Sequence, residues 1–344
     1  MKRPIALLAN DLHISTDTIS EFEKNWQELL SICCQRHIDD VVIGGDMFTS
    51  RSSQSLATLR AVDKALEDNC GLLITIAEGN HDKVDLEDTF GYNHIFRHIP
   101  NVNVVDNYEI LEWEDCDFIL LVMSYFPENG SFINNLNAAV QIAKLRCGDI
   151  VKSERDIILY VHEGIHGALG DFEIDGELPQ EPLLRFKAVL SGHYHNRIKI
   201  KGTNIEYIGS SRQHNFGEDE EKGYTILFDD GSYEFVKNQV NTRYKTIELT
   251  PSEADSYQLD KNPLYKYKVK VKCTEKEAKN FDKQKYLAIG FNKVEAITDK
   301  IVAKEAVAAE IHEKYDIKGI KREYKNYCNE NSIDCSMGIK YLEG

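Results

Sequence analysis

Short apolar runs alternate with amphipathic stretches over the first part of the chain. Residues 5–9, 41–43 and 72–76 are apolar and partly β-branched, and each run has the length of a buried strand. Between these runs, residues 20–37 and 56–66 carry apolar side chains at the three- and four-residue spacing of a helix. The order strand, helix, strand, helix, strand with short connections predicts a parallel sheet covered by helices.

Later segments continue the mixed pattern of strands and helices. Strands are expected at residues 102–105, 118–123, 157–161 and 188–190, with a helix near residues 134–145. Farther along, the pattern becomes that of antiparallel strands at residues 205–208, 224–228 and 233–236, the last two joined by a turn at residues 229–231. At the start of the first helix, Ser20 is the expected N-cap, with Glu23 as its capping-box partner.

The composition changes near Leu249-Thr250-Pro251, where the chain becomes richer in lysine and less apolar. We therefore expect a domain boundary there, between a large domain at residues 1–248 and a smaller region at residues 249–344. In the smaller region, residues 265–271 alternate lysine with tyrosine and valine, which is typical of a half-buried strand. Residues 299–329 have the pattern of one or two helices.

Charge is distributed unevenly along the chain. The net charge of the 344 residues is −16, but residues 257–344 carry about +4, which leaves roughly −20 for the first 256 residues. An acidic body fits a site whose carboxylates are neutralised by metal cations. It fits a merely soluble acidic protein as well, so charge alone leaves both readings open.

Cysteine usage and hydropathy indicate the cellular setting. The eight cysteines include no C-x-x-C pair, which argues against a zinc ribbon or a disulfide framework and predicts a reducing, cytoplasmic environment. No apolar run approaches the ~20 residues that cross a bilayer, so no membrane association is expected. The N-terminal apolar stretch ends at Asn10, short of the ~7–15 residues of a signal-peptide core, and reads as the first strand.

Five of the predicted strands are followed at once by side chains that can bind metal ions. The motifs are Asp11-x-His13, Gly45-Asp46, Gly79-Asn80-His81-Asp82, His162 and Gly192-His193-x-His195. Imidazole, carboxylate and amide groups suit Mn, Fe or Zn, and a carboxylate such as Asp46 can bridge two cations ~3.5–4 Å apart. Each motif alone is compatible with a polar turn. Five in this order predict a two-metal site at one sheet edge, where the carboxyl ends of strands meet.

Together these motifs resemble the calcineurin-like metallophosphoesterase superfamily over roughly residues 4–236. Finer details are similar to one branch, the DNA double-strand-break repair nucleases of the SbcD type and their tailed-phage recombination relatives. These details are Gly44-Gly45-Asp46-Met47-Phe48, Ser191-Gly192-His193-Tyr194-His195, Tyr207-Ile208-Gly209-Ser210-Ser211 and Lys222-Gly223-Tyr224. The resemblance implies a four-layer α/β/β/α sandwich with a smaller α+β C-terminal capping region. Asn10 departs from the family, in which small residues are commoner there, and should affect hydrogen bonds around the ligands.

The resemblance also implies two divalent cations, Mn²⁺ foremost, with Fe, Zn or Mg as alternatives. One cation would be held by Asp11, His13, Asp46 and His195, and the other by Asp46, Asn80, His162 and His193. His81 would stabilise or protonate the leaving oxygen, and Asp82 would orient the His81 ring. Arg212 would contact substrate phosphate and residues 213–215 would approach DNA, with a plain surface loop as the alternative.

The function that the resemblance implies is a DNA exonuclease and endonuclease subunit of an SbcCD-like recombination and repair complex. Its partners would be DNA, an SMC-like coiled-coil ATPase of the SbcC type and a second copy of the chain. A small-substrate metallophosphatase or cyclic-nucleotide phosphodiesterase would use the same metal chemistry, and a non-catalytic scaffold is a third alternative. The lysine-rich region after residue 250 favours the nuclease, and the presence of both His81 and Asp82 favours an enzyme.

Overall fold

The computed structural model describes residues 2–69, 71–128, 130–170, 176–260 and 262–298, together with Tyr324 and Cys328. The chain divides into two compact units, one formed by Met1–Tyr244 with Pro263–Tyr265, and the other by Lys245–Asn262 with Lys266–Gly344. The helices expected within residues 299–329 lie outside the described residues, apart from those two positions. Each unit is described by itself below.

The first unit contains two six-stranded sheets. The first sheet has the order β12-β11-β1-β2-β3-β4, with β1 (Pro4–Ala9), β2 (Asp40–Gly44), β3 (Leu73–Ala77), β4 (Val102–Val105), β11 (Gly223–Phe228) and β12 (Tyr233–Lys237). Strands β1 to β4 are parallel, as predicted for β1 to β3 from the helices between them, and β11 joins β1 in the antiparallel direction. The hairpin of β11 and β12 is confirmed.

The second sheet has the order β5-β6-β7-β8-β10-β9. Its strands are β5 (Tyr108–Leu111), β6 (Ile119–Met123), β7 (Ile157–Val161), β8 (Ala188–Ser191), β9 (Ile198–Lys199) and β10 (Ile205–Tyr207). The four inner strands run parallel, including β10, which was expected among antiparallel strands. The short edge strands β5 and β9 escaped prediction, because neither has an apolar run long enough to identify it.

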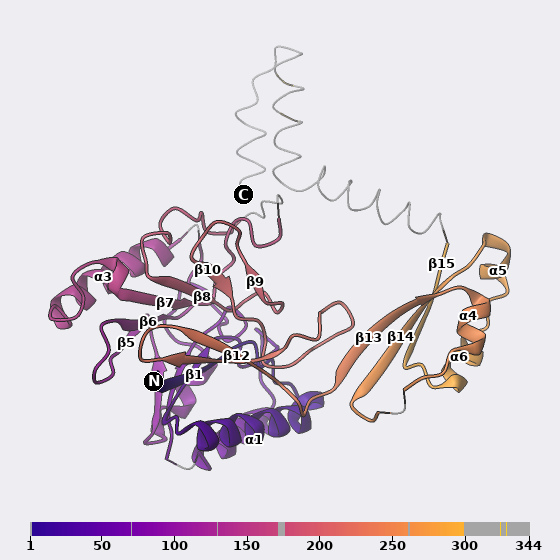
Figure 1. Ribbon diagram of the computed structural model, residues 1–344, viewed down its shortest axis with the longest axis horizontal. Helices are drawn as coiled ribbons and strands as arrows, with labels where there is room; N and C mark the ends of the chain where they lie inside the picture. Colours follow the sequence, from indigo (N-terminus) through magenta and orange to yellow (C-terminus); the bar gives the residue numbers. More distant parts are fainter. Residues whose placement is uncertain are drawn as a thin grey trace. The chain divides into compact units, whose positions relative to one another are not determined.

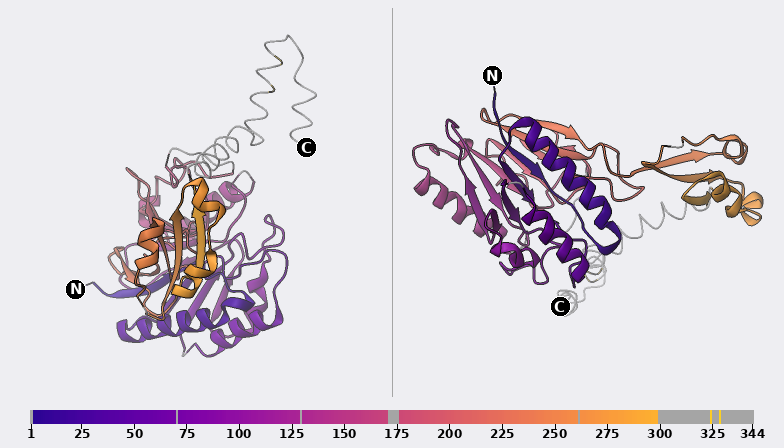
Figure 2. Two further views of the ribbon diagram at one scale, coloured as in Figure 1. Left: turned by 90° about the vertical axis from the view of Figure 1, so that its right-hand side faces the viewer. Right: turned by 90° about the horizontal axis from the view of Figure 1, so that it is seen from below.

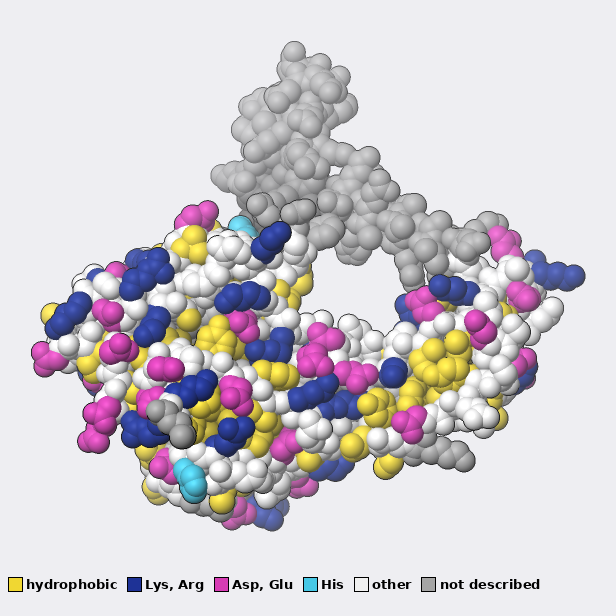
Figure 3. Space-filling model, viewed as in Figure 1, with side chains coloured by type: hydrophobic (Ala, Val, Ile, Leu, Met, Phe, Trp, Pro, Cys, Tyr) yellow, Lys and Arg dark blue, Asp and Glu magenta, His cyan; other side chains and the backbone are white. Residues whose placement is uncertain are grey.

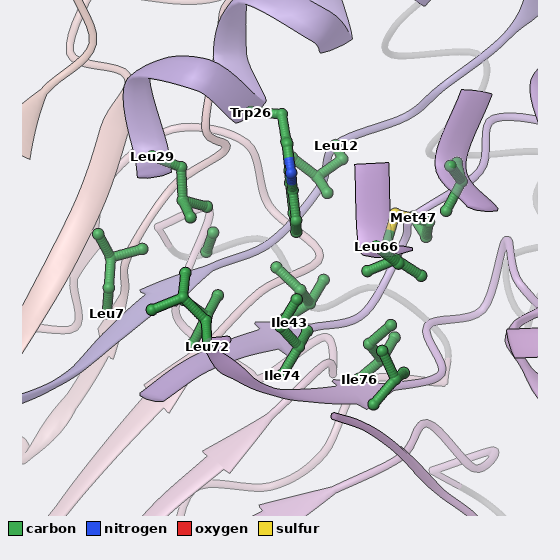
Figure 4. Packing of buried hydrophobic residues seen from close by; sticks show 14 of the residues in the cluster. Leu7, Leu12, Trp26, Leu29, Ile43, Met47, Leu66, Leu72, Ile74 and Ile76 are labelled. Carbon is green, nitrogen blue, oxygen red and sulfur yellow. The ribbon is translucent and has the colours of Figure 1, made fainter. Parts of the chain in front are cut away.

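Helices cover the outer faces of the two sheets, which gives the four layers α/β/β/α (Figures 1 and 2). Helices α1 (Ile19–Arg36) and α2 (Leu56–Glu67) pack on the first sheet, and α3 (Phe132–Arg146) packs on the second. In Figure 4, Trp26 and Leu29 of α1 lie over Ile43 and Ile74 of the first sheet. The expected sandwich is therefore confirmed.

Alternation along the strands produces separate cores on the two faces of each sheet. In β1, Leu7 and Ala9 face the helices, whereas Ala6 and Leu8 join a third core with Tyr160 of β7 between the sheets. Because strands of a buried parallel sheet are covered on both faces, they read as continuous apolar runs. This double burial fixes the strand ends from which the functional side chains project.

The expected cap of α1 at Ser20 is wrong, since Ser20 lies inside the helix. A 3₁₀ turn, η1 (Thr16–Thr18), precedes α1 and carries the capping box instead, through Ser15 and Thr18. The two other 3₁₀ segments are η2 (Tyr92–His98) and η3 (Glu154–Asp156). None of the described helices has the length and hydropathy that a membrane-spanning segment requires.

The second unit is a small α+β structure. Its sheet has the order β13-β14-β15, with β13 (Arg243–Leu249), β14 (Tyr265–Lys272) and β15 (Lys293–Ile297). Three short helices accompany it, α4 (Pro251–Ser256), α5 (Glu275–Lys279) and α6 (Lys283–Ile289). In β14, buried Tyr267, Val269 and Val271 alternate with lysines, so the half-buried strand is confirmed. The boundary expected between residues 248 and 249 falls within β13.

Candidate metal centre

The motifs singled out in the sequence meet at the carboxyl ends of strands from both sheets. The first sheet supplies the segments after β1, β2 and β3, and the second supplies those after β7 and β8. The expectation of a single sheet edge is therefore wrong, because hydrophobic periodicity identifies a strand but not the sheet to which it belongs. The site lies where the two stacked sheets bring their strand ends together.

Asp11 lies at the centre of the cluster. Its Oδ1 atom is buried, has no hydrogen-bond partner among the described residues, and lies 3.8 Å from Nε2 of each of three histidines, His13, His162 and His195. The Nε2 atoms of His13 and His195 are 3.0 Å apart. One carboxylate oxygen thus faces imidazole nitrogens that come from both sheets.

Asp46 provides a second carboxylate in the same space. Its Oδ2 lies 3.2 Å from Nε2 of His162 and 3.4 Å from Nε2 of His13. Its Oδ1 accepts a hydrogen bond of 2.9 Å from the backbone N–H of His81. Asp46 therefore connects the histidines of the cluster to the segment that carries His81.

Two overlapping groups of side chains could each hold a cation. Within each group the ligand atoms lie within 4.8 Å of one another, and the groups are Asp11, His13, His195 and Asp11, Asp46, His162. The shared residue is Asp11, whereas the resemblance implied Asp46. Asp11 Oδ1 and His162 Nε2 are buried and have no hydrogen-bond partner among the described residues, and divalent cations would satisfy them. The donor set therefore fits two cations.

Asn80 and His193 lie beside these groups. Asn80 Oδ1 is 3.2 Å from His193 Nδ1, and the backbone N–H of His193 donates to Asp11 Oδ2 over 3.3 Å. The His193 ring stands edge-on to the ring of His162, with 5.6 Å between centroids. The structure thus brings every ligand position implied by the resemblance into one neighbourhood.

Burial and mutual charge set the protonation states. Burial lowers the pKa of His13 to about 4, and burial together with His162 lowers the pKa of His193 to about 4. Both rings are then neutral, as metal ligands must be. Burial opposes the charged form of His162, but Asp46 and Asp11 raise its pKa to about 9. Burial likewise opposes the charge on Asp46, yet His162 and His13 hold the pKa of Asp46 below its usual range.

Two of the imidazoles have their tautomers set by partners on the far side of the ring. His162 Nδ1 donates to the carbonyl oxygen of Gly44 over 2.9 Å, and His195 Nδ1 donates to Glu218 Oε1 over 2.9 Å. Each contact leaves Nε2 directed at the carboxylates. Hydrogen bonds of this kind orient a histidine ligand and raise its basicity.

Left-handed backbone conformations gather at the same residues. Among the described residues, positive φ angles of non-glycine positions include Asp11 (51°), His13 (44°), Asp46 (53°) and His193 (87°). A β-carbon makes this region unfavourable, at a cost on the order of 1–3 kcal/mol for each residue. Strained backbone at four candidate ligands indicates that the surrounding contacts hold them there.

Gly79 permits a close approach between two of the motifs. A β-carbon at Gly79 would lie 2.2 Å from Asp46 Oδ1 and 2.3 Å from the Asp46 backbone nitrogen. No side chain fits at such distances, so glycine is required where the segment after β3 crosses the segment after β2.

His81 is oriented by a group that the sequence did not suggest. Its Nδ1 lies 2.7 Å from the carbonyl oxygen of Thr49 and donates to it. The expected partner, Asp82, is fully buried and accepts instead from the backbone N–H groups of Gly79, Met47 and Phe48. Burial and the charge of Asp46 raise the pKa of Asp82 to about 7. Asp82 thus binds the backbone of the segments after β2 and β3. The role expected of Asp82, orienting the His81 ring, belongs to the Thr49 carbonyl oxygen.

Arg212 is buried rather than exposed to a substrate. The residue is 3% exposed, and its guanidinium donates to the carbonyl oxygens of Leu12 and His13 over 3.2 and 3.1 Å. These contacts favour a structural role over the expected phosphate contact.

Sequence reasoning also missed Glu218, a single carboxylate in a polar loop with no motif spacing to mark it.

Comparison with known proteins agrees with this architecture. A family model described as calcineurin-like phosphoesterase matches residues 6–197, more than half of the chain. No curated protein matches the sequence. A crystal structure of the Pseudomonas putida nuclease MPE is similar at 17% identity and a TM-score of 0.29, covering 58% of this chain and 65% of that one, less than two thirds of its length. That likeness is too slight to carry a conclusion about function. On the strength of the family match, the chain belongs to the calcineurin-like phosphoesterase family.

Proposed function

We propose that this phosphoester hydrolase is a two-metal phosphodiesterase that cleaves DNA. The observation that carries the proposal is the pair of ligand groups that share Asp11 within one buried cluster. Two cations held side by side are the arrangement used for in-line displacement at phosphorus. Family membership supports the metal-dependent hydrolysis of phosphoesters, and the choice of DNA rests on the arguments below.

The chain's own residues prepare the site for this reaction. One cation would be held by Asp11, His13 and His195, and the other by Asp11, Asp46 and His162, with Asn80 and His193 as further ligands. When bound, the cations supply Lewis-acid polarisation of the phosphoester and lower the pKa of water. Asp11 and Asp46 are both buried, and buried carboxylates need neighbouring positive groups to offset the cost of desolvation.

His81 is the group placed to move a proton. Because its Nδ1 donates to the Thr49 carbonyl oxygen, its Nε2 is the atom that would accept a proton, and in the doubly protonated ring the atom that would give one to a leaving oxygen. The hydrogen bond from the His81 backbone N–H to Asp46 fixes the position of His81 relative to the candidate ligands. Its ring lies edge-on to His13, with 5.0 Å between centroids.

The second unit supplies the reason to choose a polyanionic substrate. Four lysines alternate along one face of β14, Lys266, Lys268, Lys270 and Lys272. The strand itself carries no acidic residue, while Glu295 pairs with Lys268 and Glu248 pairs with Lys272. Over the face of the first unit seen in Figure 3, Lys, Arg, Asp and Glu are interspersed. Lysine side chains that neutralise phosphates provide sequence-independent affinity for DNA.

A linear-duplex degradation assay with Mn²⁺, run beside a generic aryl phosphodiester, tests the proposal. We expect the duplex to be degraded and His81→Ala to remove that activity. Rapid turnover of the small ester with intact DNA would instead favour a small-substrate phosphatase. Absence of turnover on both substrates, with Mn²⁺ bound, would favour a scaffold.

The SbcCD-like role, in DNA repair or recombination, is also a proposal. Its support is the resemblance of the sequence motifs to the SbcD-type branch, which implies an SMC-like ATPase partner and a homodimer. Co-purification of the full chain with the product of a neighbouring gene for a long coiled-coil ATPase is the expected result. A chain that never associates with such an ATPase would contradict this role.

A further inference from the structure

Every backbone carbonyl oxygen from Asn10 to His13 accepts a hydrogen bond from one distant segment, Ser211–Glu218, which we call the clasp. The Ser211 N–H donates to Asn10 over 3.2 Å. His214 Nε2 donates to Asp11 over 2.9 Å. Arg212 donates to Leu12 and to His13 over 3.2 and 3.1 Å. The clasp thus binds the whole backbone of the segment that carries two candidate ligands.

These contacts hold a backbone that is unfavourable by itself. Asp11 and His13 have φ angles of 51° and 44°, in the left-handed region that favours glycine. Such conformations persist only where the surroundings over-determine them. The hydrogen bonds of the clasp are contacts of this kind, because each one fixes the direction of a peptide plane between or next to the strained residues.

The same segment also reaches a ligand from the second sheet. Glu218 Oε1 accepts from His195 Nδ1 over 2.9 Å. Glu218 is itself held in place, since its Oε2 accepts from the His214 N–H over 3.0 Å and its Oε1 from Asn215 Nδ2 over 2.7 Å. These two hydrogen bonds fix the Glu218 carboxylate in the position from which it orients the His195 ring. His195 then presents Nε2 to Asp11.

His214 completes the enclosure of the two imidazoles. Its ring is 5.1 Å from the ring of His13 and 4.8 Å from the ring of His195, measured between centroids. Because His214 Nε2 is occupied by the Asp11 carbonyl oxygen, this nitrogen is not offered as a ligand. His214 instead packs behind His13 and His195 and limits their rotation.

We propose that the clasp is a positioning element of the metal centre, in which Glu218 acts through His195, and His214 acts through Asp11 and His13. The inference rests on the proposed metal site and adds residues that no comparison assigns, since the family match ends at residue 197. A carboxylate that hydrogen-bonds a histidine ligand typically contributes about 10–100-fold to metal affinity. A loop that merely covers the sheet ends would contribute nothing to that affinity.

Calorimetric titration of the metal-free full chain with MnCl₂ measures the Mn²⁺ affinity and tests the clasp. We expect Glu218→Ala to weaken Mn²⁺ binding by about 10–100-fold. Glu218→Gln retains an oxygen that can accept from His195, so its affinity should lie between those of the wild type and Glu218→Ala. The matched control is Glu221→Ala, which removes a neighbouring carboxylate that pairs with Lys237 at the surface; it should bind Mn²⁺ as the wild type does.

The midpoint of thermal unfolding without metal separates positioning from folding. We expect Glu218→Gln and Glu221→Ala to unfold near the wild-type temperature, with a smaller Mn²⁺-induced rise for Glu218→Gln alone. Wild-type affinity in both Glu218 variants would overturn the clasp and leave the two-metal proposal standing. A wild-type chain that binds no Mn²⁺ would overturn the metal site itself. If Glu218→Ala fails to fold, the Mn²⁺ affinities of the other three proteins test the clasp. Weaker binding by Glu218→Gln than by the wild type and Glu221→Ala would support it, and equal binding by all three would overturn it.

Discussion

Gln213 and Tyr244 exchange two hydrogen bonds of 2.8 Å, from the Gln213 side-chain amide to the Tyr244 carbonyl oxygen and from the Tyr244 N–H to Gln213 Oε1. The amide of Gln213 also donates to the carbonyl oxygen of Glu218 over 2.8 Å. Tyr244 is the residue at which the first compact unit gives way to Lys245 of the second. The clasp is therefore fastened to Tyr244, within the first unit.

Gln213→Ala should lower the stability of the first unit. The substitution removes these hydrogen bonds to partly buried backbone groups, at a cost of about 2–3 kcal/mol in the free energy of unfolding. Urea unfolding measures this cost, and calorimetry with MnCl₂ should show weaker binding as well. The control is Gln239→Ala, since Gln239 is exposed and donates to Lys237. Equal losses of stability in the two variants would contradict the prediction.

Gly79→Ala should disrupt the site without a polar change. The new β-carbon would collide with the side chain and backbone of Asp46, 2.2 and 2.3 Å away. A displacement of about 1 Å in a catalytic group can cost on the order of 100-fold in rate. Steady-state phosphodiesterase rates with Mn²⁺ measure this loss. At Gly148 the nearest atom to an added β-carbon is 3.0 Å away, so Gly148→Ala should keep its activity.

The local motifs of the site could be read from the sequence, because each follows an apolar run that ends abruptly. Asp11-x-His13 after β1 and His193-x-His195 after β8 were found in this way. The assembly could not be read, since the same period describes a strand of either sheet. The two sheets are brought together by the packing of side chains in the core between them, and local sequence patterns do not specify that packing.

The residues that sequence reasoning missed act through atoms that carry no pattern. Thr49 orients His81 through its backbone carbonyl oxygen, which every residue possesses. Glu218 is one carboxylate in an acidic loop, and only the fold brings it to His195. Ser20 failed as a cap because the 3₁₀ turn at Thr16–Thr18 begins the helical segment earlier. Local propensity could not reveal that competing turn.

Removal of divalent cations should destabilise the protein. A ligand that binds only the folded state adds about 2.7 kcal/mol at 100 times its Kd, so MnCl₂ should raise the thermal midpoint and EDTA should reverse the rise. Asp46→Asn should abolish most of this shift, because the substitution removes a buried carboxylate from the cluster. Asp117→Asn is the control, since Asp117 is 85% exposed. A Mn²⁺-induced shift of wild-type size in Asp46→Asn would contradict the assignment.

Glu21 should make the protein sensitive to acid through contacts that do not involve the candidate metal ligands. Burial opposes its charge, but hydrogen bonds from the Thr242 backbone, Lys24 and Asn241 lower the pKa of Glu21 to about 2, from 4.5. Because the folded-state pKa is the lower one, the stabilisation is complete above pH ~4.5 and is lost as the pH falls toward ~2. Glu21→Gln should therefore cost about 1–2 kcal/mol at pH 7, after allowance for solvent screening, and little near pH 2. Urea unfolding at a series of pH values measures the difference, with the exposed Glu23→Gln as control. A difference between wild type and Glu21→Gln that stays constant from pH 7 to pH 2 would show that the carboxylate charge is not its source.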